Sequence, residues 1–211
     1  MNLLTTIILP LLIAYFIGSI PTSVWVGRIF HGVDVRNEGS GNAGATNTIR
    51  VLGLTTGLPV LLFDIFKGFI AVFILKYFDS GLSGDHYVYL QIGMAAMAVV
   101  GHIFPVYAGF KGGKGVATIA GAGIALYPWA FLIILGVFIL TFIISKTVSI
   151  SSITAAICFP LIVILITNET SLPLILLSLA VGVFIPITHR KNIKRLIKGE
   201  EPKFKFKRKA S

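Results

Sequence analysis

The sequence predicts an all-α integral membrane protein with seven transmembrane helices. Of its 211 residues, 55% are hydrophobic and only 12% are charged, and the mean hydropathy is +0.92. A soluble chain of this length could not bury so much apolar surface in one core. The apolar stretches also lack the strict alternation of barrel strands, whereas helices satisfy their own backbone polar groups inside a bilayer. We therefore expect helical spans.

The expected spans are apolar stretches long enough to cross about 30 Å of hydrocarbon at about 1.5 Å per residue, with one exception. They lie near residues 3–27, 59–78, 87–107, 116–127, 129–145, 153–167 and 172–188. The exception, 116–127, could be a re-entrant hairpin by length alone. No basic region precedes Leu3 and no small-residue cleavage site follows the first stretch, so we expect an uncleaved span rather than a signal peptide.

The distribution of basic residues decides between seven crossings and six. If the N-terminus is outside and all seven stretches cross, Lys76 alone lies near the outer face and Lys67 lies within a span. The other 16 of the 18 Lys and Arg residues are then cytoplasmic, as the positive-inside rule requires. If 116–127 were a re-entrant segment that does not cross, a group of these cations would lie on the outer side of the membrane. The sequence therefore predicts seven spans with a cytoplasmic C-terminus.

Two domains are expected: a seven-span catalytic domain at 1–198 and a basic cytoplasmic tail at 199–211. The stretch 189–211, which includes this tail, supplies most of the net charge of +10, and such charge beside a span usually orients the protein and attracts anionic lipid. We expect no nucleic-acid partner, because no recognition fold precedes the tail. The single cysteine, Cys158, excludes an intramolecular disulfide framework and a cysteine metal cluster.

The first polar island, GSGNAGATNTIR at 39–50, has the composition of an anion-binding loop. Glycines let backbone N–H groups converge, hydroxyls and amides add neutral donors, and an arginine can clamp phosphate through two hydrogen bonds. The alternative is an ordinary cytoplasmic turn with helix caps at Ser40 and Thr46. A plain turn rarely needs so many donors, so we favour a binding role. The donor side chains are Ser40, Asn42, Thr46, Asn47, Thr48 and Arg50.

The second island, GFKGGKGVATIAGAG at 109–123, places glycines and lysines directly before a helix. A helix N-terminus offers unsatisfied N–H groups and the positive end of the dipole, so this segment also favours phosphate. It is not a Walker loop, because the spacing fails and no preceding strand is present. The alternative is a flexible hairpin whose lysines only orient the protein. The small residues Ala117, Gly121 and Ala125 are interpreted as helix packing.

The third island, HRKNIKR at 189–195, follows the last span. His189, Asn192 and Arg195 are spaced i, i+3, i+6 and so share one side of a helix, which joins a titratable imidazole, an amide and a guanidinium. The alternative is a solvated basic helix end.

Single polar residues lie between the islands. Ser149, Ser151 and Ser152 are interpreted first as helix-capping residues at the entry to the sixth span. Asp64 and Lys67 are expected to pair or to line a polar cavity, because either charge alone is costly inside a membrane. His102 is either a buried, hydrogen-bonded histidine or part of the site. His31 and His86 are expected at the surface.

The three islands, in this order on a seven-span frame, resemble those of the bacterial acyl-phosphate:glycerol-3-phosphate acyltransferases. The resemblance covers nearly the whole chain and implies a multi-pass enzyme of the bacterial inner membrane with its active site at the cytoplasmic face. It implies acyl transfer from acyl-phosphate to the 1-hydroxyl of sn-glycerol 3-phosphate, giving lysophosphatidic acid and inorganic phosphate in the first acylation of phospholipid synthesis. Neither a cofactor nor a metal is implied.

The resemblance also implies which residues act, and the residues themselves leave the proton acceptor open. Catalytic roles fall to Ser40, Arg50, Lys114, Ser152, His189 and Asn192, and substrate-binding roles to Asn42, Thr46, Asn47, Gly112, Gly113, Gly115 and Arg195. No triad accompanies a serine or cysteine, so a covalent acyl-enzyme is not expected. The hydroxyl proton passes either to His189 or to a phosphate oxygen of the substrate.

Two other function classes compete with this interpretation. A transporter for a phosphorylated solute would also have small residues and a basic cavity, but midplane broken helices and an inverted repeat would be expected. A metal-dependent headgroup phosphotransferase would need clustered aspartates, which the chain does not have.

Overall fold

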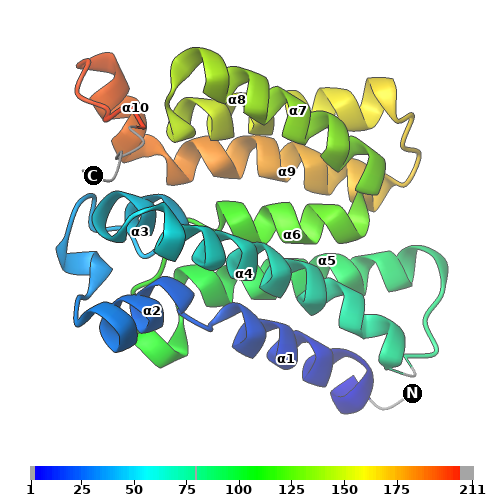
Figure 1. Ribbon diagram of the computed structural model, residues 1–211. Coiled ribbons are helices and arrows are strands. Elements are labelled where there is room, and N and C mark those ends of the chain that lie inside the picture. The colour runs from blue at the N-terminus through cyan, green and yellow to red at the C-terminus, as the bar shows by residue number, and fades with distance from the viewer. Residues whose placement is uncertain (1–2, 79, 205–211) are drawn as a thin grey trace. The chain divides into compact units, whose positions relative to one another are not determined.

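The computed structural model describes residues 3–78 and 80–204, and these form helices and connections without a strand (Figure 1). The chain divides into two compact units, Met1–Leu126 and Tyr127–Ser211. The helices of the first unit are α1 Leu9–Gly18, α2 Thr22–His31, α3 Ala45–Leu52, α4 Leu54–Phe73, α5 Gly84–Ile103 and α6 Val116–Leu126. Those of the second are α7 Pro128–Ser145, α8 Val148–Leu161, α9 Leu172–Thr188 and α10 Arg190–Ile197.

Within the described residues, five helical runs are long and apolar enough to cross a membrane. They are Leu4–His31, Leu54–Tyr77, Gly84–Ala108, Pro128–Ser145 and Val148–Ile166. A sixth candidate is α9 with α10, which are bent by 58° at their junction, and α6 is a shorter apolar helix. The expected all-helical membrane class is confirmed, while the count of seven crossings and the orientation stay predictions.

In the first unit, α4 packs closely on α6 through paired glycines. A Cβ on Gly121 would lie 1.8 Å from the carbonyl oxygen of Ile65, and one on Gly68 would lie 2.0 Å from that of Thr118. Only glycine therefore allows this backbone approach. Ala125 packs against the buried cluster that includes Ala122. These contacts confirm the interpretation of Gly121 and Ala125 as packing residues, while that of Ala117 stays a prediction.

The first apolar stretch, predicted as one span over 3–27, is broken between α1 and α2. Pro21 has no backbone N–H and disfavours helical geometry at the residue before it, so α1 ends at Gly18 and α2 begins at Thr22. The break leaves the carbonyl oxygen of Ile20 without its helical partner. Lys67 Nζ of α4 donates to that oxygen at 2.9 Å, so the interruption places a charged side chain inside the first unit.

The second unit is built on α7, α8 and α9, which lie side by side in Figure 1. Tyr127 donates its hydroxyl to the carbonyl oxygen of Leu174 at 2.7 Å and sets its ring edge against Phe159. The outer side of α7 carries strongly exposed side chains such as Trp129 and Ile144, as a lipid-facing helix would. The turn from α9 into α10 occurs at His189, so the third island begins at the bend.

Candidate active site

Asn47 organises the first polar island. Its Nδ2 donates to the carbonyl oxygens of Val35 and Glu38 at 2.7 and 3.0 Å, and its Oδ1 accepts from the backbone N and the hydroxyl of Ser40 at 2.8 and 3.1 Å. Both amide hydrogens and both oxygen lone pairs are thereby used within the loop. The side chain is 1% exposed. The structure thus gives Asn47 a role that the sequence did not predict, in shaping the loop that carries Ser40.

The glycines of this island fulfil a backbone requirement. Gly39 and Gly41 have φ of +61° and +72°, in the left-handed region. A Cβ on Gly39 would also lie 2.4 Å from Asn47 Oδ1. Ser40, between them, is exposed at the turn. Glycine is therefore needed on either side of Ser40, the serine to which the resemblance gives a catalytic role.

Arg36 ties the segment directly before the first island to the start of the second island, within the first unit. Its guanidinium bonds Asp34 through Nε and Nη2, and its Nη1 donates to the carbonyl oxygens of Ala108 at 2.7 Å and Lys111 at 3.3 Å. The hydrogen bond from Arg36 holds the pKa of the Asp34 carboxyl well below its ordinary value, against the opposing effect of partial burial. An open depression of about 480 Å³ lies beside this clamp, lined by both loops.

The second island is anchored on the end of α5. The backbone N–H groups of Gly112 and Gly113 donate to the carbonyl oxygens of Ile103 and His102 at 3.0 and 3.1 Å. A Cβ on Gly113 would lie 2.2 Å from His102 Nε2 and 2.7 Å from the carbonyl oxygen of Ala43. The two glycine-rich loops are therefore in contact. The N–H groups of Gly112 and Gly113 thus bond the end of α5 and fix the shape of the loop.

The other predicted residues of the first unit lie around these loops. Arg50 is exposed on α3, and Thr46 is half-buried in the first turn of that helix. Asn42 is half-buried before it. Lys114 is half-buried immediately before Gly115, whose φ is +80° and which precedes α6. Exposed Ser40 and half-buried Lys114 thus lie on the two loops that Arg36 joins. Exposed Arg50 lies on α3, which follows the first of these loops.

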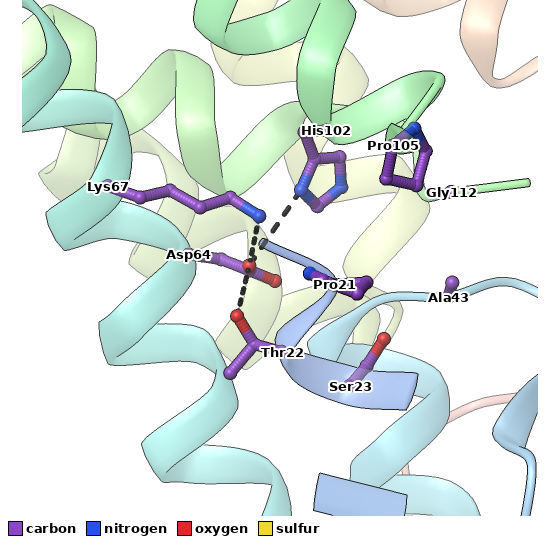
Figure 2. A pocket seen from close by; sticks show the side chains of 9 residues that line it. All are labelled: Pro21, Thr22, Ser23, Ala43, Asp64, Lys67, His102, Pro105 and Gly112. Carbon is purple, nitrogen blue, oxygen red and sulfur yellow. Dashed lines mark hydrogen bonds and ion pairs between the residues drawn. The ribbon is translucent and has the colours of Figure 1, made fainter. Parts of the chain in front are cut away.

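A buried charge cluster lies beneath the loops. Lys67 Nζ is 2.8 Å from Asp64 Oδ1, and both residues are 2% exposed. Figure 2 shows Lys67, His102 and Thr22 all directed toward Asp64, with Gly112 of the second island at the edge of the same cavity. The expected pairing of Asp64 with Lys67 is confirmed. The cavity holds about 10 Å³, the size of one water, so the cluster supports the loops rather than binding a substrate.

The three remaining histidines are one buried residue, His102, and two exposed ones. His102 is buried, with Nδ1 at 3.8 Å from Asp64 Oδ1. Within residues 3–78 and 80–204, that nitrogen has no hydrogen-bond partner. His31 and His86 are exposed, as predicted. Across the same residues, no group of three His, Cys, Asp or Glu side chains could hold a metal ion.

In the second unit, His189 has a defined orientation at the bend between α9 and α10. Its Nδ1 lies 2.9 Å from the carbonyl oxygen of Ile185, so Nδ1 must carry the proton of that hydrogen bond. The neutral ring then has its lone pair on Nε2. Thr188 Oγ1 lies 3.3 Å from the same Nδ1. The hydrogen bond to Ile185 thus fixes the tautomer of the neutral ring.

The serines at the start of α8 do not cap it, contrary to the expectation. Thr147 is the N-cap residue and makes no side-chain capping bond. Ser151 and Ser152 instead donate to the carbonyl oxygens four residues earlier, at 3.0 and 2.9 Å, because a serine inside a helix can bond the preceding turn. Ser149 donates to Glu201 at 2.8 Å.

Glu201 joins α8 to α10. Besides Ser149, its carboxylate accepts from Asn192 Nδ2 at 2.5 Å and from Arg195 Nε at 2.6 Å. Burial alone would raise the pKa of the Glu201 carboxyl, but the hydrogen bonds from Arg195, Asn192 and Ser149 lower it overall. Asn192 and Arg195 thus share one helix face, as their spacing predicted. Sequence reasoning missed Glu201 because it lies in the stretch assigned to the tail, where an acidic residue among lysines was the available signal.

Comparison with known proteins decides the family. A family model described as glycerol-3-phosphate acyltransferase matches residues 8–199. The chain belongs to the glycerol-3-phosphate acyltransferase family. It is 45% identical to the glycerol-3-phosphate acyltransferase of Listeria welshimeri, covering 95% of this chain and 98% of that one. It is 41% identical to the one of Chlorobium phaeovibrioides, covering 97% and 99%.

Solved structures of this family share the fold. The crystal structure of PlsY, an integral membrane glycerol 3-phosphate acyltransferase, in its glycerol 3-phosphate form is 36% identical. It matches with a TM-score of 0.81 over 94% of this chain and 95% of that chain. The lysophosphatidic acid form matches with a TM-score of 0.80 at 35% identity. The present chain is therefore a membrane acyltransferase of phospholipid synthesis, as the resemblance implied.

Proposed function

We propose that this acyltransferase transfers a fatty acyl group from acyl-phosphate to the 1-hydroxyl of sn-glycerol 3-phosphate. The products are lysophosphatidic acid and inorganic phosphate. The observation that carries the proposal is the match to a family member solved with glycerol 3-phosphate and with lysophosphatidic acid. Both substrates carry a phosphate, which would also account for the presence of two cationic loops, since a single phosphate would need only one such loop.

The reaction needs alignment and charge neutralisation more than activation. The hydroxyl oxygen attacks the carbonyl carbon, the bond from that carbon to the phosphate oxygen breaks, and phosphate leaves with the electron pair. Acyl-phosphate is already activated, so holding the hydroxyl against the carbonyl supplies much of the rate. Cations that neutralise the leaving phosphate supply the rest. No cofactor is needed for this chemistry.

Two groups can take the hydroxyl proton. His189 is supported by its geometry, because Nδ1 is engaged by the carbonyl oxygen of Ile185 and the lone pair lies on Nε2. A phosphate oxygen of the substrate, with a second pKa of about 6, is the alternative. The site residues then divide by charge: Arg50 and Lys114 in the first unit, and Arg195 in the second, would neutralise phosphate.

The neutral site residues have supporting roles in the same proposal. Ser40, Ser152 and Asn192 act at the reaction centre. Asn42, Thr46 and the glycines 112, 113 and 115 contribute to binding around the first-unit loops. Asn47 contributes by holding Ser40. We propose that both units serve this one reaction.

The proposal includes the topology. Seven crossings with the N-terminus outside would put the three islands at the cytoplasmic face of the bacterial inner membrane, where the acyl chain reaches the site from the bilayer. Residues 1–198 would form the catalytic domain and 199–211 the basic tail. The excess of Lys and Arg in the loops assigned to the cytoplasm supports this orientation.

The decisive experiment incubates purified protein with palmitoyl-phosphate and radiolabelled glycerol 3-phosphate and measures lysophosphatidic acid. Product is expected with palmitoyl-phosphate and not with palmitoyl-coenzyme A. Product only with the coenzyme A donor would overturn the donor assignment. Uptake of radiolabelled glycerol 3-phosphate into proteoliposomes without product would instead favour a transporter, and dependence on added divalent metal would contradict the metal-free chemistry.

A further inference from the structure

Three donors from two helices converge on one buried carboxylate in the second unit. Glu201 Oε1 accepts from Ser149 of α8 and Asn192 of α10, and Oε2 accepts from Arg195 of α10. Its side chain is 5% exposed. A buried charge is stable only when it is paired and hydrogen-bonded, and here both conditions are met. The carboxylate is therefore an organised part of the unit, although it lies beyond the end of α10.

The residues after α10 are fixed in place on both sides of Glu201. Gly199, with φ of +71°, turns the chain back after α10. The backbone N–H of Phe204 donates to the carbonyl oxygen of Lys146 at 2.7 Å, and its ring meets that of Phe142 edge-on. These contacts hold the segment against the connection between α7 and α8. Glu201 is thus presented to α10 by backbone contacts that do not involve its own side chain.

The bonds to Glu201 constrain two side chains that the proposed function uses. The bond from Arg195 Nε fixes the plane of the guanidinium and hence the direction of its two Nη groups, which form the fork that binds phosphate. The bond from Asn192 Nδ2 fixes the orientation of that amide. An ionised acceptor makes hydrogen bonds about twice as strong as a neutral one. The carboxylate charge therefore matters more to this constraint than the shape of the side chain.

We propose that Glu201 is a positioning residue, which holds Asn192 and Arg195 in the orientation that engages the anionic substrate. This inference rests on the proposed function, since it assigns the two side chains to substrate. If Glu201 only held the segment after α10 in place, removing its charge would change the stability of the protein and nothing else. The two roles differ in whether removing the charge of Glu201 changes substrate binding and turnover in protein that is still folded.

The test compares Glu201→Gln, which is isosteric but neutral, with Glu200→Gln. Glu200 is adjacent and exposed, so its variant removes the same charge as a matched control. Misplacing a binding group by about 1 Å can cost about 100-fold in rate, so we expect kcat/KM of folded Glu201→Gln to fall about 10- to 100-fold. Glu201→Asp, which keeps the charge, should recover part of the loss. Glu200→Gln should match wild type.

A double-variant cycle separates positioning from fastening. Residues that act through one another show non-additive effects. Glu201→Gln should therefore cost much less kcat/KM in an Arg195→Ala background than in wild type. Equal costs in both backgrounds, or a Glu201→Gln variant with the kcat and KM of Glu200→Gln, would overturn the inference while leaving the proposed function intact.

Phosphate binding gives a readout that does not depend on turnover. The rise in unfolding temperature on adding inorganic phosphate or glycerol 3-phosphate to detergent-purified protein reports binding to the folded state. We expect this rise to be smaller in Glu201→Gln than in Glu200→Gln. If wild type binds phosphate in this way but makes no lysophosphatidic acid, the proposed function fails, while a smaller rise in Glu201→Gln still shows that Glu201 orients a phosphate-binding group. An equal rise in the two variants overturns the inference.

Discussion

Replacing Asn47 with aspartate should destabilise the first polar loop, although the two side chains have nearly the same shape. The substitution exchanges an NH₂ group for an oxygen of nearly the same size. The two bonds that Ser40 donates to Oδ1 can persist. The two that Nδ2 donates to Val35 and Glu38 cannot, because an ionised carboxylate has no hydrogen to give. A negative oxygen then faces two carbonyl oxygens at 2.7 and 3.0 Å.

The expected cost follows from these contacts. Both carbonyl oxygens keep a backbone partner, Val35 from the N–H of Glu38 and Glu38 from the N–H of Gly41. The two lost hydrogen bonds cost about 1–3 kcal/mol together, and the buried carboxylate oxygen left unsatisfied costs about 1–3 kcal/mol more, so the total is about 2–6 kcal/mol. Stronger charge-assisted bonds from Ser40 recover about 1 kcal/mol. The net loss of about 1–5 kcal/mol corresponds to a fall of roughly 2–20 °C in the unfolding temperature of a chain of this size. Because the loop carries Ser40, kcat/KM should fall at least about tenfold as well.

The assay is thermal unfolding of detergent-purified protein together with the lysophosphatidic acid assay. Asn37→Asp is the control, because Asn37 is exposed in the same loop and the change adds the same charge. We expect this control to unfold within about 1 °C of wild type, since exposed substitutions usually have small effects. If Asn47→Asp behaved like Asn37→Asp in both measurements, the loop would not depend on the Asn47 hydrogen bonds and this reasoning would be refuted.

Three further predictions use other parts of the molecule. Lys67→Met should destabilise the protein by about 3–5 kcal/mol in thermal unfolding, because it leaves Asp64 buried without its cation. Adding Asp64→Asn should restore much of the lost stability. Equal stability of the single and double variants would contradict this. Asp34 has a pKa depressed below 3.8, so its contribution to stability is present above about pH 4 and is lost as the pH falls further. Chemical unfolding as a function of pH should therefore show a shallower acid loss in Asp34→Asn than in wild type, and parallel curves would count against the Arg36 clamp. His189→Ala should lose nearly all turnover with normal substrate binding if the imidazole takes the proton, whereas a fall of only about 10- to 100-fold would favour the substrate phosphate.

The fold class and the paired charges could be predicted because they follow from rules that act along the sequence. Apolar length and composition predict membrane helices, and a charge inside such a helix must find a partner, as Lys67 and Asp64 do. The break before Pro21 was missed, although proline gave the signal, because hydropathy alone favours a continuous span. The number of crossings depends on α6, whose length does not decide it.

The candidate site was predictable in its residue types but not in its internal bonding. Glycines, hydroxyls and cations indicated phosphate, yet nothing in the spacing shows that Asn47 satisfies its own loop or that Gly112 and Gly113 bond the end of α5. Glu201 was missed for a similar reason. Its role depends on the chain reversing after α10, a long-range arrangement that a basic, polar sequence does not reveal.

The central claim is that the three polar islands lie on the same side of the membrane. Single cysteines can test it after Cys158 is replaced by alanine, with Arg50→Cys, Lys111→Cys and Lys191→Cys introduced one at a time at exposed positions. Asp85→Cys, at an exposed position in the first turn of α5, is the control for the outer face. The account predicts that a membrane-impermeant maleimide labels all three island positions only from the cytoplasmic side and the control only from outside. Labelling of any island position from the outside alone would contradict it.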